Sequence, residues 1–263
     1  MTAKLVKSVS NIDPDAAIDR IVREMRAIYS EVGADGILVN VKNTLSSFIN
    51  LVIAIRVAGR SKCYGIYFEK PHENFKNIER MYVLSRFNLS RIDIKHIYRY
   101  VARNMPDLGL PKQALKSIQK GIEEGVEMLF LRLYASENNY ILSGDIEKTR
   151  WLTGAFSRHL LGSFDVLPLA SIFKTQLRPI ARRLRIIHLA KNADEPSEWV
   201  EFKRRLGIED VPDEKIDAIL YGLESNWSTE EIASDLEIDE NIVVKLKEVV
   251  QSATVLKKLP LML

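Results

Sequence analysis

The stretch GILVNVKNTLSSFINLVIAIRVAG, residues 36–59, decides the fold class of this 263-residue chain. The apolar run within residues 37–41 is typical of a strand that is buried on both faces of a parallel sheet. Residues 45–58 form an apolar segment of helical length that ends at Gly59, and glycine commonly closes helices. The next apolar run, residues 63–68, predicts a second strand. The region therefore predicts a strand–helix–strand unit.

The alternation of helix and strand continues on both sides of this unit. A helix should begin at Pro14, after the helix-start residue Asp13, and reach about Val32. The elements predicted downstream are a helix near residues 75–87, a strand at 90–94, a helix from about 113 to 137 and a strand at 140–143. We predict an α/β fold: a Rossmann-like parallel sheet of about five strands, with helices on both faces and a helical C-terminal part. One domain should span residues 1–263, with the sheet in 1–185 and a loop with C-terminal helices in 186–263.

Composition and charge exclude several classes of protein. Lys and Arg number 38 against 35 Asp and Glu, an excess too small for a dedicated nucleic-acid binder. Cys63 is the single cysteine, so a disulfide framework within the chain is excluded and a cytoplasmic location is expected. The N-terminus lacks an apolar signal region, and no uncharged stretch approaches the roughly 20 residues of a membrane span. The four histidines do not have metal-ligand spacing.

The loop after the first predicted strand is the first place to expect a ligand, because parallel sheets bind ligands at the carboxyl ends of their strands. This loop reads KNTLSS, residues 42–47, and contains no glycine. A phosphate cradle needs converging backbone N–H groups, and glycine allows the close approach and positive φ angles that bring them together. The loop is therefore poorly suited to hold phosphate.

Three segments together resemble the ammonia-dependent NAD synthetase family, whose fold is a Rossmann-like sheet of the ATP-pyrophosphatase type. Residues 36–59 resemble the first strand, loop and helix of that family. Residues 140–184 resemble its Gly-Thr-Gly-Asn-Lys-Thr-Glu loop and Lys-Thr-Gln helix start, and residues 215–260 resemble its C-terminal helices. The resemblance implies a homodimer that activates nicotinate adenine dinucleotide with MgATP and then lets ammonia displace AMP.

Most functional positions of that family carry other residues here. In the Ser-Gly-Gly-x-Asp-Ser loop, the equivalents of serine, the two glycines, aspartate and the last serine are Lys42, Asn43, Thr44, Ser46 and Ser47. In the second loop Lys148 and Thr149 are retained, but Arg150 replaces the family's magnesium-ligating glutamate. A carboxylate side chain that binds the metal ion in the family is thus replaced by a cationic side chain.

Further positions of the resemblance are mixed. Asp165 and Lys174 are retained, while Leu161 replaces an aspartate. Two family arginines that face the dinucleotide correspond to Gly125 and Glu127. The family's acidic segment before the C-terminal helices is replaced by basic residues, namely Lys203, Arg204 and Arg205.

These replacements predict a non-catalytic family member that acts as a dimeric binding or partner protein. The alternative is an active ammonia-dependent NAD synthetase. No catalytic residue, metal ligand or cofactor is predicted, although the family implies ATP and magnesium. The partner would be a second copy or an active paralogue, and a weak anion or nucleotide ligand is possible. The degenerate nucleotide-binding positions are Lys42, Ser46, Ser47, Lys148, Thr149, Arg150, Asp165 and Lys174.

The cations at these positions leave two outcomes open. Arg150 converges with Lys42 and Lys174 to form a metal-free anion site, or it pairs with Glu147 or Asp145 and closes the site. Ser47 and Asp165 also have structural interpretations, as a helix-start hydroxyl and as an internal cap or ion pair.

Two other classes of function and the assembly complete the sequence-based expectations. An enzyme of different chemistry lacks a defensible nucleophile–base pair. A nucleic-acid binder would use residues 228–236, which resemble the first half of a helix-turn-helix, but the following helix has mixed charge. For the dimer, the resemblance implies burial of the long helix, whose apolar residues Ile118, Ile122, Val126, Leu129 and Leu133 are spaced by three and four.

Overall fold

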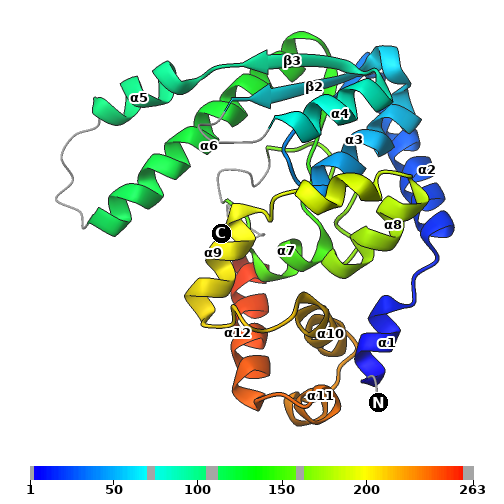
Figure 1. The fold of residues 1–263 in the computed structure, drawn as a ribbon, viewed down its shortest axis with the longest axis vertical. Coiled ribbons are helices and arrows are strands. Elements are labelled where there is room, and N and C mark those ends of the chain that lie inside the picture. Colours follow the sequence, from blue (N-terminus) through cyan, green and yellow to red (C-terminus); the bar gives the residue numbers. More distant parts are fainter. Residues whose placement is uncertain (1–2, 70–74, 105–111, 158–162, 257–263) are drawn as a thin grey trace.

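The computed structural model describes residues 3–69, 75–104, 112–157 and 163–256 (Figure 1). Its sheet has the strand order β3-β2-β1-β4 and every pair is parallel. The strands are β1 (Gly36–Asn40), β2 (Cys63–Phe68), β3 (Asn88–Ile92) and β4 (Tyr140–Ser143). The predicted α/β class is confirmed, and β3 begins two residues before its predicted start.

The sequence predicted about five strands, and the described residues form a sheet of four. Next to β4, Ser143 makes one isolated parallel bridge to Val166. This single pair lies where a fifth strand would extend the sheet, and it is too short to count as one.

Helices cover both faces of the sheet (Figure 1). The α-helices are α1 (Lys4–Ser10), α2 (Pro14–Val32), α3 (Leu45–Ala58), α4 (Lys76–Ser85), α5 (Lys95–Arg103), α6 (Lys112–Glu137), α7 (Lys148–Thr153), α8 (Leu177–Arg183), α9 (Ser197–Leu206), α10 (Asp213–Glu224), α11 (Thr229–Leu236) and α12 (Glu240–Leu256). Short 3-10 helices are η1 (Arg60–Lys62), η3 (Lys174–Gln176) and η4 (Ile187–Asn192). None of the helices in the described residues is long and apolar enough to cross a membrane.

Alternate residues of β1 enter the cores on opposite faces of the sheet, as the two-residue repeat of a strand requires. Ile37 and Val39 pack with α2, α3 and α8 on one face. Leu38 packs with Met128 and Leu131 of α6 on the other. This two-sided burial explains the continuous apolar run in the sequence.

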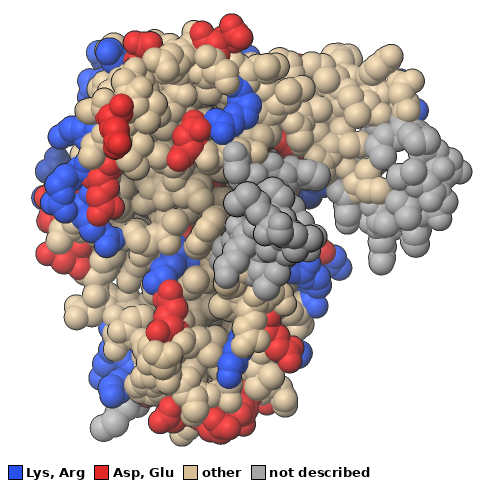
Figure 2. Space-filling model, turned by 180° about the vertical axis from the view of Figure 1, so that it is seen from behind, with Lys and Arg blue, Asp and Glu red and all other residues tan. Residues whose placement is uncertain are grey.

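The surface mixes charges of both signs. On the face in Figure 2, acidic and basic side chains lie interspersed among larger areas of other residues, in keeping with a formal net charge of +3. A mixed surface of this kind does not build the single-sign field that attracts nucleic acid from a distance.

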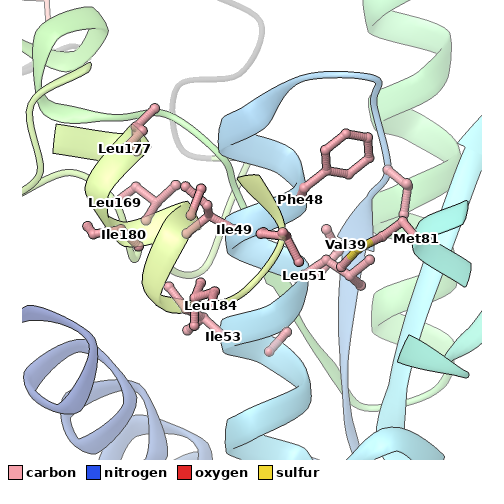
Figure 3. Packing of buried hydrophobic residues seen from close by; sticks show 14 of the residues in the cluster. Val39, Phe48, Ile49, Leu51, Ile53, Met81, Leu169, Leu177, Ile180 and Leu184 are labelled. Atoms are coloured by element: carbon pink, nitrogen blue, oxygen red, sulfur yellow. The ribbon is translucent and has the colours of Figure 1, made fainter. Parts of the chain in front are cut away.

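Helix α3 is buried along most of its length, and the loop before it lies at the carboxyl end of β1. In Figure 3, Ile49 and Ile53 lie toward Ile180 of α8 and toward Leu184, which follows that helix, whereas Leu51 lies toward the strand β1. The helix is thus fixed from two sides, and so is the loop before it. The N-terminal end of α3 cannot shift without disturbing this core.

A separate apolar cluster joins α1 to the C-terminal helices α9 to α12. Helix α1 was not predicted, because its N-terminal N–H groups are satisfied from a distant part of the chain. Asp235 of α11 accepts hydrogen bonds from the N–H groups of Lys4 and Leu5, at 3.0 and 2.9 Å. The last of these C-terminal helices, α12, has 17 residues.

Candidate functional site

The carboxyl ends of β1 and β4 meet the N-terminal ends of α3 and α7 at one edge of the sheet. Two hollows lie here, a smaller one of about 180 Å³ beside Ser46, Glu147 and Lys174, and a larger one of about 460 Å³ beside Lys42 and Arg150. We call the two hollows together the crevice. It lies where a parallel sheet is expected to hold a ligand.

The first loop uses its own side chains to satisfy two of its backbone N–H groups. The Lys42 N–H donates to Ser47 Oγ at 2.9 Å, and the Ser47 N–H donates to Thr44 Oγ1 at 3.3 Å. Thr44 is the N-cap of α3. Both of these N–H groups are therefore occupied by side chains of the loop itself.

Asn43 ties this loop to the segment that follows η4. Its side chain is 1% exposed and donates to Asn192 O at 3.0 Å and to Asp194 Oδ2 at 2.9 Å. Its own Oδ1 accepts from Asn77 Nδ2 at 3.0 Å. A family glycine position is therefore a buried structural bridge in this chain.

Arg150 is buried in the crevice and paired with two carboxylates. Its Nε donates to Glu147 Oε2 at 2.6 Å, and its terminal nitrogen donates to the Asp145 carbonyl at 2.7 Å and lies 3.8 Å from Asp145 Oδ2. Burial alone would lower the pKa of Arg150, but the charges of Glu147 and Asp145 outweigh burial and raise that pKa above its ordinary value. Of the two outcomes predicted for Arg150, the pairing with Glu147 and Asp145 is the one found.

The residues of the crevice do not fit the magnesium ion that the family would use. Ser46 Oγ donates to Asp145 Oδ2 at 3.2 Å and lies 3.4 Å from the Arg150 guanidinium. Magnesium prefers carboxylate and water oxygens, and a fixed guanidinium in their midst repels it. In the part of the chain that the structure describes, no group of three or more His, Cys, Asp or Glu could hold a metal ion.

The two retained lysines are also paired. Lys174 Nζ forms an ion pair with Glu195 and lies 3.6 Å from Asp213 Oδ2. Lys148 Nζ lies 2.7 Å from Glu224 Oε2 and 4.5 Å above the Phe173 ring. The convergence of Lys42, Arg150 and Lys174 as unpaired cations is therefore wrong, because Arg150 and Lys174 are neutralised by nearby carboxylates.

Three other predicted site residues have structural partners. Ser47 Oγ donates to the Asn40 carbonyl at 3.2 Å, inside the turn that joins β1 to α3. Asp165 caps the Leu142 N–H at 2.7 Å and pairs with Arg132 at 2.8 Å, which matches its predicted role as a cap or ion pair. Thr149 is fully buried and donates to Asp217 Oδ1 at 2.6 Å.

The remaining positions of the resemblance are spread over the molecule. Glu127 of α6 accepts from Asn40 Nδ2 at 3.4 Å and lines the larger hollow, whereas Leu161 lies outside the described residues. Lys203 and Arg204 lie on α9 and pair with Asp213 and Glu201. The charged residues that line the crevice near this part of the chain are acidic, including Asp194, Glu195, Glu198 and Asp213.

Asp217 is a buried carboxylate that the sequence did not single out. It accepts from Thr149 Oγ1 at 2.6 Å, from the Thr175 N–H at 2.8 Å and from Thr175 Oγ1 at 2.7 Å. It therefore links α7 and η3 to α10 beneath the smaller hollow. Burial raises the pKa of Asp217 to about 6, even though these three hydrogen bonds act to lower that pKa.

The raised pKa of Asp217 makes the stability depend on pH. The folded protein binds this proton more tightly than the unfolded chain, so the contribution of Asp217 is complete below about pH 4 and is lost as the pH rises to about 6. Two pKa units correspond to about 3 kcal/mol. We expect Asp217→Asn to remove this pH dependence of the free energy of unfolding. The measurement is urea unfolding at pH 4, 5, 6 and 7, which gives the difference in that free energy between variant and parent at each pH. A difference that is constant over this range would contradict the assignment.

Known proteins that resemble this chain point to one family. The model of the NAD synthase family matches residues 17–260. The NH3-dependent NAD+ synthetase of Pyrobaculum aerophilum is 25% identical over 218 residues, covering 82% of this chain and 80% of the relative. The protein of the same name from Pyrococcus horikoshii is 25% identical over 263 residues, with 95% of each chain covered.

Two solved structures have the same fold. The NH3-dependent NAD synthetase of Campylobacter jejuni superposes with a TM-score of 0.74 at 17% identity, covering 96% of this chain and 99% of the other. The NMN synthetase of Francisella tularensis superposes with a TM-score of 0.76 at 15% identity, with the same coverage.

Proposed function

Because this chain belongs to the NAD synthase family, we propose that it keeps the family's fold but has exchanged the MgATP-dependent reaction for a binding role. The observation that carries the proposal is the buried cluster of Arg150 with Glu147 and Asp145. In this cluster a positive guanidinium stands where the family resemblance implies a negative metal ligand. The cluster is neutralised from within the chain, so it has no need of a metal ion.

The larger hollow carries more negative than positive charge. Its lining includes seven carboxylates and three cations. The carboxylates are Glu123, Glu124, Glu127, Asp145, Asp194, Glu195 and Glu198, and the cations are Lys42, Lys120 and Arg150. Adenylyl transfer needs positive charge that offsets the charge developing on the phosphates. A hollow with this balance repels a triphosphate that arrives without metal.

The names of the relatives favour a second candidate, the ammonia-dependent formation of NAD itself. The curated relatives named above are NH3-dependent NAD+ synthetases and are similar over most of the chain. Lys148, Thr149 and Lys174 also agree with the family's motifs. For the chain to form NAD, other groups would have to bind magnesium in place of the missing ligands.

One assay separates the two candidates. The purified chain is incubated with MgATP, an ammonium salt and nicotinate adenine dinucleotide, and NAD is measured by an enzymatic cycling assay. The Pyrococcus horikoshii relative serves as the positive control and heat-treated protein as the background. We expect NAD at the background level. Formation of NAD in proportion to the amount of protein would establish the second candidate.

We further propose that the chain works as a dimer through the arm formed by α5 and α6, which lie side by side and project from the body (Figure 1). Met128 and Leu131 of α6 are buried against the chain's own sheet. Leu129 and Leu133 are 58% and 56% exposed, and Tyr100 of α5 is 72% exposed. Leu129 and Leu133 are the part of the apolar stripe of α6 that is left for a partner, and Tyr100 lies on the neighbouring helix. The partner is a second copy or an active paralogue. A cytoplasmic location stays a prediction.

A charge on the exposed stripe should dissociate the dimer. Burying a leucine contributes about 1.5–3 kcal/mol, so Leu129→Asp should raise the dissociation constant more than tenfold. Sedimentation velocity at micromolar concentration should give twice the chain mass of 30.1 kDa for the parent and the chain mass for the variant. The matched control is Val200→Asp on α9, where the side chain is 52% exposed. A parent that sediments as a monomer would rule out the self-associated form.

A further inference from the structure

One side of helix α10 carries carboxylates although the helix lies inside the protein. Residues 216–220 of α10 are at most 1% exposed, so a charged side chain among them needs buried partners. Asp213, Asp217 and Glu224 are spaced by four and seven residues, which places them on the same side of a helix. We call these three residues the acidic face. Helix α10 packs on α7 and η3, and both of these elements begin with a Lys-Thr pair, residues 148–149 and 174–175.

The threonines of both Lys-Thr pairs bind the middle carboxylate of the acidic face. Thr149 Oγ1 donates to Asp217 Oδ1 at 2.6 Å. The N–H and Oγ1 of Thr175 donate to Asp217 Oδ2 at 2.8 and 2.7 Å. Thr149 Oγ1 in turn accepts from the Lys174 N–H at 2.8 Å, so the two Lys-Thr pairs are also bonded to each other. Asp217 is therefore held by two separate elements at once.

The lysines of both Lys-Thr pairs reach the outer carboxylates of the same face. Lys148 Nζ lies 2.7 Å from Glu224 Oε2, and Lys174 Nζ lies 3.6 Å from Asp213 Oδ2. The complementary contacts thus extend from the first to the last residue of α10. They give the retained residues Lys148, Thr149 and Lys174 a role that needs no bound ligand.

These contacts lie between two parts of the molecule that have their own apolar cores. Helices α1 and α9 to α12 share one core, and we call these five helices the helical cluster. The sheet shares two other cores with the helices on its faces. The helical cluster meets the rest of the chain mainly where α10 and α12 contact α7, and where α1 and α10 contact η3. Figure 1 shows the helical cluster below the sheet, with α7 between them.

We propose that the two Lys-Thr pairs are a docking site for the acidic face, and that the helical cluster opens from the sheet as one unit when this contact is released. The core inside the helical cluster stays intact in this opening, as in other sub-global openings of native proteins. Burial disfavours the charged form of Asp217, so its exposure to water offsets part of the lost hydrogen bonding.

The opening has a consequence for the crevice. Its smaller hollow is lined by Leu45 and Ser46 of α3 and by Asp213 and Glu214 of α10. Because α3 belongs to the sheet part and α10 to the helical cluster, movement of the cluster widens this hollow. The docking site therefore controls access to the hollow, whether or not the chain forms NAD.

Hydrogen exchange of the native protein, followed by mass spectrometry of its peptides, tests the opening. In the parent, amides of α10 and α12 should exchange at least tenfold faster than those of β1 and α3. The double variant Thr149→Val, Thr175→Val removes both hydroxyl donors to Asp217. It should speed exchange in α10 and α12 at least tenfold, because one hydrogen bond to a charged group changes an equilibrium constant by about tenfold or more. Equal protection of all four elements in the parent would overturn the proposal.

Two control variants separate this opening from general destabilisation. Ile53→Val trims a fully buried side chain of α3, so it should speed exchange in β1 and α3 and leave α10 and α12 as in the parent. Thr153→Val removes a buried hydroxyl whose bonds stay within α7, and it should change α10 and α12 by less than about threefold. Acceleration of α10 and α12 by either control to the level of the double variant would refute the docking site. The parent and Ile53→Val decide the question even if the double variant does not fold.

Discussion

Replacement of Arg150 by methionine should lower the free energy of unfolding by about 3–5 kcal/mol, because it leaves two buried carboxylates without their cation. Arg150 is 3% exposed, and its partners Glu147 and Asp145 are 1% and 6% exposed. Glu147 Oε1 has no hydrogen-bond partner in the described structure, so the charge of this carboxylate depends on Arg150 all the more. The variant must bury that charge or protonate it. Both are costly in an apolar surrounding.

Urea unfolding of three variants measures this cost. Arg150→Met alone should give the full loss, and the double variant Arg150→Met, Glu147→Gln should recover a large part of it, because the remaining amide carries no charge. The control Arg204→Met breaks an exposed pair with Glu201 and should cost less than about 1 kcal/mol. If Arg150→Met were as stable as the control, Arg150 would be a dispensable ligand-facing residue and the closed cluster would be wrong.

The elements that sequence patterns predicted well are those with strong local signals. The strand at residues 63–68 matches β2, and the helix at 45–58 matches α3. Both lie in the interior, where a buried strand or helix needs a continuous apolar run. In contrast, β3 is an edge strand with largely exposed side chains, so its sequence carries less apolar signal and its start was misplaced by two residues.

The parts that could not be predicted depend on partners far apart in the sequence. Helix α1 takes its N-terminal hydrogen bonds from Asp235, more than 200 residues away. Asp217 meets Thr149 across 68 residues, and no spacing rule connects them. Asp194 and Glu195 read as part of an ordinary polar loop until the fold brings them to Asn43 and Lys174.

The pairing of Arg150 was predictable as one of two outcomes because its partners are local. Glu147 lies three residues earlier and Asp145 five residues earlier. In the family's Gly-Thr-Gly-Asn-Lys-Thr-Glu loop, these two positions carry asparagine and threonine. The loop has therefore gained two acids together with the arginine. Such a coordinated change of charge is what a self-neutralising cluster requires.

Restoring the family's first loop should leave NAD formation at least about two decades below that of the active relative, because Arg150 still replaces the family's magnesium-ligating glutamate and the loss of one such contact costs about two or three decades. The variant carries Lys42→Ser, Asn43→Gly, Thr44→Gly and Ser46→Asp. Its new carboxylate at position 46 would not be available for magnesium. Ser46 Oγ already lies 3.4 Å from the Arg150 guanidinium, so a carboxylate there pairs with Arg150 and adds to the closed cluster.

The same variant tests whether the loop or Arg150 blocks the reaction. Circular dichroism must first establish that the variant is folded, because Asn43→Gly removes the bonds to Asn192 and Asp194. NAD is then measured beside the Pyrococcus horikoshii relative under identical conditions. Recovery of turnover by the four loop changes alone would mean that Arg150 is no obstacle. Absence of turnover in the loop variant, with magnesium-dependent turnover once Arg150→Glu is added, would identify the buried guanidinium as the group that excludes the metal.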